Sequence, residues 1–224
     1  MGEAQQRDEL AQALESLRAH LSWWRDTGLS GLQRGAPRLD PLEAVAHELG
    51  DCQRCPLAQT RQHMVFGAGH PRARLVLVGE APGAEEDRQG IPFVGKAGQL
   101  LTRMLAAIGL ARDEVYICNV LKCRPPRNRD PRPDEIASCE PFLRKQLAAI
   151  EPELVVAMGA HAAQTLLRRT EGISRLRGRM HTYEGIDLIA TFHPAYLLRS
   201  PERKAMAWED LKRIRARLEQ GGTR

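Results

Sequence analysis

Short apolar runs alternate with stretches of helical periodicity along most of this chain, and that alternation restricts the fold more than any other feature. The apolar runs lie at residues 74–78, 115–121, 154–157 and 187–192. Runs that are apolar at nearly every position are typical of parallel strands buried on both faces. Helices are predicted between and after them, at about residues 97–108, 133–150, 160–168 and 204–220. We therefore expect an α/β fold, with a parallel sheet and helices on both of its faces.

Length and composition fit one compact domain with a helical appendage. The chain has 224 residues, of which 42% are hydrophobic and 27% are charged, as in an ordinary globular protein. This length is sufficient to bury a substantial core. The formal net charge of +5 is compatible with a polyanionic partner without requiring one.

The N-terminal part of the chain is predicted to form an amphipathic helix that packs against the main domain. Its apolar residues recur at helical spacing. They are Leu10, Leu14, Leu17, Leu21, Trp23 and Trp24. A glycine-rich linker follows between residues 28 and 37. We assign residues 1–38 to this helix and linker, and residues 39–220 to the main domain, which begins with a short helix near residues 41–49.

No secretory or membrane segment is predicted. Charged residues from Glu3 to Arg18 leave no apolar region of the kind that a signal peptide needs. No stretch approaches the roughly 18 apolar residues of a membrane span. Five cysteines in such a chain are more typical of metal ligands or free thiols than of disulfides. We expect a cytoplasmic, monomeric protein.

Four of the five cysteines have the character of a metal site. Cys52 and Cys55 form a C-x₂-C pair, whereas Cys123 and Cys139 follow much further along the chain. Four thiolates suit either tetrahedral zinc or an iron–sulfur cluster, and the spacing alone leaves both open. Cys118 precedes Asn119 on a predicted strand, so it is expected to face the other side as a small buried hydrophobe.

Polar residues stand where three of the predicted strands end. Glu80 follows the first strand, Asn119 lies late in the second, and His193 follows the fourth. Ligands of open parallel sheets bind outside the carboxyl ends of the strands. The three side chains are therefore expected to converge on one site.

The same region carries five short motifs in order. They are GEAPGAEED (79–87), PFVGKAGQLL (92–101), NVLKCRPP (119–126), NRD (128–130) and HPAYLLR (193–199). Together with the four cysteines, they resemble the family 4 uracil-DNA glycosylases over about residues 40–215. The resemblance implies a three-layer α/β/α fold with a central four-stranded parallel sheet. It also implies a [4Fe-4S] cluster on Cys52, Cys55, Cys123 and Cys139, and excision of uracil from DNA.

The resemblance also assigns the residues of a uracil pocket. It implies that the Ala81 N–H faces uracil O2, that Glu80 lies near the scissile bond, and that Glu86 lies close to C5. The bulk of Glu86 would then exclude the methyl group of thymine. Phe93 would supply the apolar face on which a flipped base stacks, and Asn128 matches a further pocket residue of the family.

Asn119 and His193 have the chemistry to recognise the base and to help it leave. A side-chain amide has donors and an acceptor, so it can pair with both O4 and N3 of uracil but mismatches cytosine. A histidine donor near O2 stabilises the negative charge that develops when the glycosidic bond breaks. The histidine can act as a neutral donor or as an imidazolium. Glu80 is the best candidate for activating the attacking water.

Contacts with DNA are expected from two segments. Leu197 and Leu198 form an apolar tip that would wedge into the base stack, although they would equally begin the last helix and pack inward. Arg199 would then contact a phosphate. Arg124, Arg127 and Arg129 lie between two of the cysteines and suit phosphate contacts.

We therefore expect an enzyme that hydrolyses the N-glycosidic bond of uracil in single- or double-stranded DNA and leaves an abasic site. Lys96 and Lys122 fall within the motifs without a Schiff-base role, so strand cleavage is not expected. Three alternatives remain. The chain would otherwise be a non-catalytic DNA-binding module, a member of the branch that becomes covalently trapped on DNA, or a zinc-stabilised hydrolase of free nucleotides.

Overall fold

The computed structural model describes residues 12, 14–19, 22 and 39–221. The chain divides into two compact units, Met1–Leu39 and Asp40–Arg224. In the first unit, residues 14–19 are helical, as predicted, and Leu14 and Leu17 are exposed. Leu10, Leu21, Trp23, Trp24 and the glycine-rich linker lie outside the described residues, so the predicted packing of this helix stays a prediction.

The second unit is built on a mainly parallel sheet with the strand order β1-β3-β2-β4-β6-β5. Its four central strands are parallel, and they are the four predicted from the apolar runs. They are β2 (Leu75–Gly79), β3 (Tyr116–Asn119), β4 (Leu154–Met158) and β6 (Ile186–Thr191). The register aligns Gly79 with Asn119. The ends of β2 and β3 therefore lie side by side.

Two short antiparallel strands extend the predicted four-stranded sheet to six. β1 (Ala68–Gly69) pairs with β3, and β5 (Met180–Tyr183) pairs with β6. Both are edge strands and lack the continuous apolar pattern that identified the others. A two-residue turn joins β5 to β6, and both of its residues, Glu184 and Gly185, have positive φ, as in the favoured hairpin turns.

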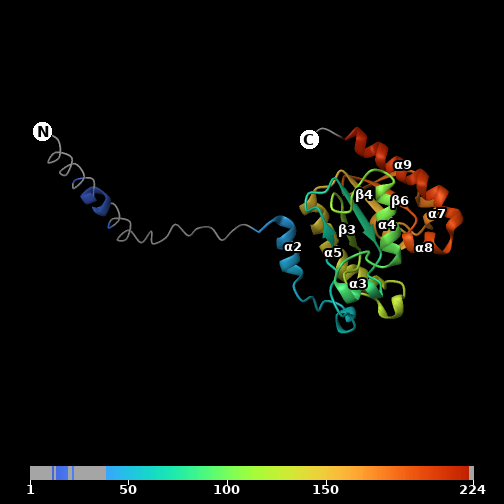
Figure 1. Cartoon of the computed structure of the whole chain (residues 1–224). Helices are drawn as coiled ribbons and strands as arrows, with labels where there is room; N and C mark the ends of the chain where they lie inside the picture. The colour runs from blue at the N-terminus through green and yellow to red at the C-terminus, as the bar shows by residue number, and fades with distance from the viewer. Residues whose placement is uncertain (1–11, 13, 20–21, 23–38, 222–224) are drawn as a thin grey trace. The chain divides into compact units, whose positions relative to one another are not determined.

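Helices cover both faces of the sheet and complete the three layers (Figure 1). One face packs against α4 (Lys96–Ala106), α8 (Pro194–Arg199) and α9 (Lys204–Gln220). The other packs against α2 (Pro41–Leu49), α5 (Pro133–Ile150) and α6 (Ala160–Leu167). Alternate residues of each strand enter the two cores: Leu75 and Leu77 belong to the first, Val76 and Val78 to the second. None of the described helices is long and apolar enough to cross a membrane.

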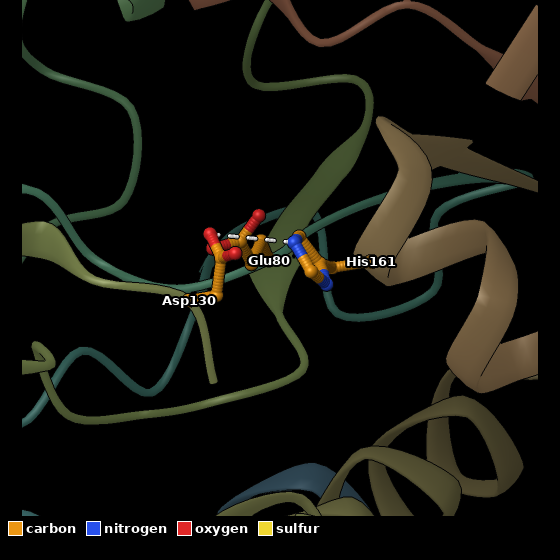
Figure 2. Close-up of side chains that lie close together, drawn as sticks. All are labelled: Glu80, Asp130 and His161. Carbon is orange, nitrogen blue, oxygen red and sulfur yellow. Dashed lines mark ion pairs between the residues drawn. The ribbon is translucent and has the colours of Figure 1, made fainter. Parts of the chain in front are cut away.

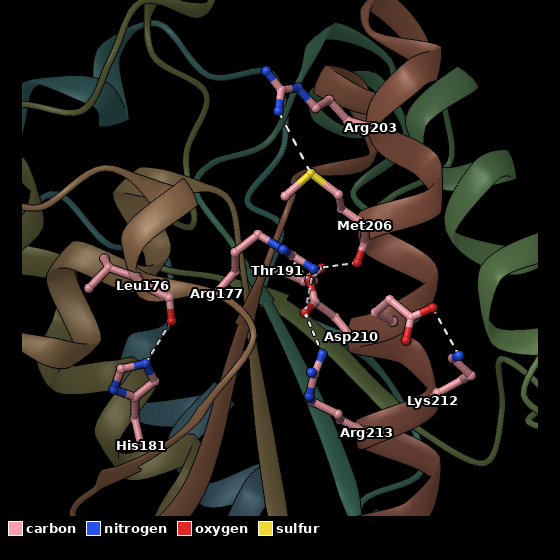
Figure 3. A network of polar contacts seen from close by, with 10 residues as sticks. Leu176, Arg177, His181, Thr191, Arg203, Met206, Asp210, Lys212 and Arg213 are labelled. Carbon is pink, nitrogen blue, oxygen red and sulfur yellow. Dashed lines mark hydrogen bonds and ion pairs between the residues drawn. The ribbon is translucent and has the colours of Figure 1, made fainter.

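A buried polar network ties α9 to the end of β6 and to Arg177, which follows α7 (Ile173–Leu176) (Figure 3). Arg177 donates two hydrogen bonds of 2.8 Å to the fully buried carboxylate of Asp210. The hydroxyl of Thr191 donates a third, also of 2.8 Å. The Arg177 guanidinium also lies over the Phe192 ring, 5.2 Å from its centroid. This network fixes the strand end from which His193 projects.

Candidate active site

The residues predicted to converge at the strand ends line one cavity of about 480 Å³. Glu80 and Ala81 follow β2, Asn119 ends β3, and His193 follows β6. Glu86, in α3 (Ala84–Gln89), also lines the cavity, as do Phe93, Asn128, Arg129 and Arg199. Topology thus brings together residues that are more than a hundred positions apart in the sequence.

Asn119 presents an unpaired polar atom in this cavity. The residue is only 1% exposed, and among the described residues no donor reaches its side-chain oxygen. An unsatisfied buried acceptor costs about 1–3 kcal/mol, so a ligand with a matching donor would recover this energy. A Cβ at Gly79 would lie 2.3 Å from this oxygen and 2.7 Å from the Phe93 ring. Only glycine fits opposite them.

The main chain of Asn119 is held from below by a buried lysine. Lys122 is 1% exposed, and its ammonium donates a 2.7 Å hydrogen bond to the Asn119 carbonyl. Its backbone N–H lies 3.2 Å from the sulfur of Cys139. Lys122 therefore links the strand end that carries Asn119 to the cysteine site.

Phe93 is buried between the sheet and the cavity in a left-handed conformation. Its φ is +54°, which costs about 1–2 kcal/mol for a residue with a side chain. α4 packs closely below it, since a Cβ at Gly98 would lie 1.7 Å from the Phe93 carbonyl oxygen. The Phe93 and His193 rings lie 5.5 Å apart, tilted by 34°. Together they leave an apolar surface toward the cavity.

Glu86 is fixed by the start of α4. One of its carboxylate oxygens accepts hydrogen bonds of 3.0 Å from the backbone N–H groups of Val94 and Gly95. Gly95 is the residue that caps α4, and the positive end of a helix favours a carboxylate there. These bonds fix the orientation of the Glu86 side chain at the cavity wall.

His193 has a defined tautomer in this structure. It caps α8, and its Nδ1 accepts a 3.1 Å hydrogen bond from the Ala195 N–H. Burial and the nearby charge of Arg199 together lower the pKa of His193 to about 4, against the opposing charge of Glu86. The ring is therefore neutral at pH 7, and its proton lies on Nε2. The sequence left this charge state open.

Glu80 lies beside two residues that the sequence analysis did not assign to the site. Its carboxylate, Asp130 and His161 place their ligand-type atoms within 4.8 Å of one another (Figure 2). Burial raises the pKa of Glu80; the charge of His161 opposes this change, and that of Asp130 reinforces it. His161 follows β4, the one central strand for which no polar end residue was predicted. The strand-end rule applied to β4 would have found it.

The predicted metal ligands lie apart from Cys118, which belongs to the core of the sheet. Cys55, Cys123 and Cys139 share one cluster with Leu57 and Leu121. Burial raises the pKa of Cys123 to about 11; the Arg61 guanidinium, which donates to its sulfur at 3.4 Å, opposes this. Cys52 accepts from Arg54 at 3.3 Å. Within the described residues, no three of these sulfurs lie within 4.8 Å of one another.

The arginines predicted to contact DNA differ in whether they already form hydrogen bonds within the protein. Arg129 forms two hydrogen bonds with the buried carboxylate of Glu135, at 2.9 and 2.5 Å. Arg124 donates to the side-chain oxygen of Asn128 at 2.7 Å. Arg127 and Arg199 are exposed. Arg129 and Arg124 therefore also shape the loop, in addition to any phosphate contact.

The predicted leucine wedge is wrong for Leu197. Leu197 is 1% exposed and belongs to the core formed with α4 and α9. Leu198 is 39% exposed, because consecutive residues of a helix point in different directions. Of these two leucines, Leu198 is the one available as an apolar tip.

The fold and the cavity define a class of α/β proteins with a pocket of about 480 Å³ at the carboxyl ends of the strands. Residues 66–212 match the family model described as the uracil DNA glycosylase superfamily, to which the chain therefore belongs. The chain is 44% identical to the type-4 uracil-DNA glycosylase of Archaeoglobus fulgidus over 184 residues, which cover 79% of this chain and 92% of the relative. It is 42% identical to the type-4 uracil-DNA glycosylase of Sulfurisphaera tokodaii, over 79% of this chain and 84% of the relative. It is also 42% identical to that of Thermotoga maritima, over 83% and 98%. These relatives confirm the resemblance to family 4.

Proposed function

We propose that this chain is a monofunctional uracil-DNA glycosylase, which hydrolyses the N-glycosidic bond of deoxyuridine in DNA and leaves an abasic site. The observation that carries the proposal is the buried amide oxygen of Asn119, which has no hydrogen-bond partner among the described residues and faces a cavity walled by Phe93 and His193. A base inside duplex DNA must be flipped out to reach such a pocket.

Asn119 would select uracil over cytosine. Its side-chain oxygen would accept the N3 proton of uracil, and its NH₂ group would donate to O4. Cytosine has an acceptor at N3 and an amino group at C4, so each contact would oppose like groups. Unpaired buried groups cost about 1–3 kcal/mol each. Two such mismatches would largely exclude cytosine.

His193 and the Ala81 N–H would stabilise the departing base. When the bond between C1′ and N1 breaks, the electron pair stays with uracil and the charge spreads to O2. A neutral imidazole with its proton on Nε2 can donate to that oxygen without needing an acidic solution. A well-aimed donor of this kind is worth about 3–4 kcal/mol in the transition state.

Glu80 would activate the attacking water as a general base. The sugar becomes positively charged as the base departs, and water attacks C1′ while its proton passes to the Glu80 carboxylate. Glu86, held rigidly against α4, would occupy the space near C5 and exclude the methyl group of thymine. Excision of thymine by Glu86→Ala would support this role, and a variant that still ignored thymine would contradict it.

We further propose that Cys52, Cys55, Cys123 and Cys139 hold a [4Fe-4S] cluster. The four thiols are soft donors, and three of them accept hydrogen bonds from Arg54, Arg61 or the Lys122 N–H. Four thiolates would also hold one zinc ion, and bound iron with visible absorbance distinguishes the two groups. The cluster would join the loop of Cys52 to α5 as a structural tie.

DNA would be contacted by Leu198, Arg199, Arg124 and Arg127, with Arg129 shaping the same loop. Neither lysine of the motifs lines the cavity. Lys122 is buried against Asn119, and Lys96 is exposed at the start of α4. A Schiff base with the sugar is therefore not part of the proposal.

Release of free uracil from a uracil-containing oligonucleotide tests the function. The wild type should release uracil and leave an alkali-labile site, while Asn119→Ala and His193→Ala should each lose about 100-fold or more in single-turnover rate. His47→Ala, on the exposed face of α2, is the matched control and should retain full rate. Equal rates in all proteins would refute the assigned roles. No release by the wild type would favour the non-catalytic alternative, a heat-stable protein–DNA adduct the trapping one, and a preference for dUTP over DNA the nucleotide hydrolase.

A further inference from the structure

Glu80, Asp130 and His161 come from three separate segments and lie close together (Figure 2). Glu80 and Asp130 line the cavity, and His161 lines the neighbouring groove. Glu80 directly follows β2, and Asp130 lies in the loop after the short helix η2 (Pro126–Asn128). His161 is the second residue of α6, which starts where Gly159 adopts a φ of +94°. The Nε2 atom of His161 lies 3.4 Å from a carboxylate oxygen of Asp130.

The carboxylates of Glu80 and Asp130 lie within 4.8 Å of each other. Two ionised carboxylates at this distance repel each other unless a positive charge lies beside them. The imidazole of His161 is placed to supply that charge. We propose that His161 and Asp130 are positioning residues for Glu80: protonated His161 bridges the two carboxylates and keeps Glu80 ionised and directed toward the cavity. The catalytic consequence rests on the proposed function, whereas the coupling among the three side chains does not.

The electrostatics of Glu80 agree with this geometry. Burial raises its pKa, the charge of His161 lowers it, and the charge of Asp130 raises it. The two neighbours therefore act on Glu80 in opposite directions.

Other charged groups surround the three residues and are common to every variant below. Those that line the cavity are Glu86, Arg129, His193 and Arg199. Those that line the groove on the other side of His161 are Glu140, Arg144 and Arg168. Because none of them is altered, comparison among variants isolates the contribution of His161 and Asp130.

The test is the pH dependence of single-turnover uracil excision for the wild type, His161→Gln, Asp130→Asn and the double variant. EDTA is included so that no divalent cation replaces the imidazole between the carboxylates. The acidic limb of the curve of rate against pH should move to higher pH in His161→Gln and to lower pH in Asp130→Asn. Each shift should be about 0.5 pH unit, because the two charges are partly exposed. The double variant should return the limb close to that of the wild type.

The two changed side chains are 35% and 80% exposed, so all variants should fold, and equal thermal midpoints would verify this. His47→Gln, on the exposed face of α2, should leave the profile unchanged. Structural damage would lower the rate at every pH but would not move the limb in opposite directions. Superimposed limbs, or shifts in the same direction, would overturn the proposal.

A titration of the Glu80 carboxyl carbon by NMR in the free protein separates this proposal from the proposed function. It should shift upward in His161→Gln and downward in Asp130→Asn, whether or not uracil is released. If the protein excises no uracil but these shifts occur, the coupling of Glu80 to His161 and Asp130 is supported and the proposed function is refuted. If uracil is released while the Glu80 titration is the same in all proteins, the proposed function is supported and the coupling of Glu80 to His161 and Asp130 is refuted.

Discussion

A single methyl group at Gly79 should disable the pocket, because this position faces both the base reader and the stacking ring. A Cβ built there lies 2.3 Å from the Asn119 oxygen and 2.7 Å from the Phe93 ring. Ordinary contact begins at 3.4 Å, so Asn119 would have to move by about 1 Å. Displacements of about 1 Å in a reacting geometry cost roughly 100-fold in rate. We expect Gly79→Ala to lose about that factor in single-turnover uracil release.

Stability should fall only modestly in this variant, by about 1–3 kcal/mol, as for other overpacked sites. Folding is checked by thermal unfolding, and the matched control is Gly172→Ala, where an added Cβ meets nothing within 4 Å. The control should keep both its rate and its thermal midpoint. A Gly79→Ala variant that folds and excises uracil within about threefold of the wild type would refute the assigned arrangement of Asn119 and Phe93.

Three further predictions concern the histidine, the buried ion pair and the cysteines. Because the folded-state pKa of His193, about 4, lies below the ordinary value of about 6.5, the unfolded chain binds the extra proton first. The contribution of neutral His193 to the free energy of unfolding should be complete above pH 6.5 and be lost as the pH falls toward 4. The measurement is denaturant unfolding at several pH values. A free energy of unfolding that rose on acidification in the wild type relative to His193→Gln would contradict this. Removing one partner of the buried pair in Asp210→Ala should cost about 3–5 kcal/mol, measured by denaturant unfolding, whereas a loss under about 1 kcal/mol would show that Arg177 is adequately solvated without it. Visible absorbance and bound iron should be lost in Cys123→Ala but retained in Cys118→Ala, and equal iron content in the two variants would exclude Cys123 as a ligand.

The central sheet was predictable because its four parallel strands are buried on both faces and are therefore apolar throughout. The edge strands were not. β1 has two residues, and β5 is partly exposed, so neither has a distinctive pattern. The Glu184-Gly185 turn was the available signal for the β5–β6 hairpin, although a glutamate in a left-handed conformation is an uncommon one.

The site was predictable to the extent that parallel strands align their carboxyl ends. That rule placed Glu80, Asn119 and His193 in one cavity. It does not give side-chain directions within a helix, so Leu197 was assigned to the surface although it packs in the core. The tautomer of His193 also could not be predicted, since it depends on a hydrogen bond with the backbone of α8.

That hydrogen bond gives the imidazole an unusual anchor. Many active-site histidines are oriented by a neighbouring carboxylate, but here the peptide group of Ala195 performs the task. Turning the ring over would leave the first turn of α8 without its cap, a loss of about 1 kcal/mol for a typical helix. The start of α8 therefore fixes the direction in which the Nε2–H group of His193 points. The side chains around the ring can be substituted without changing that direction.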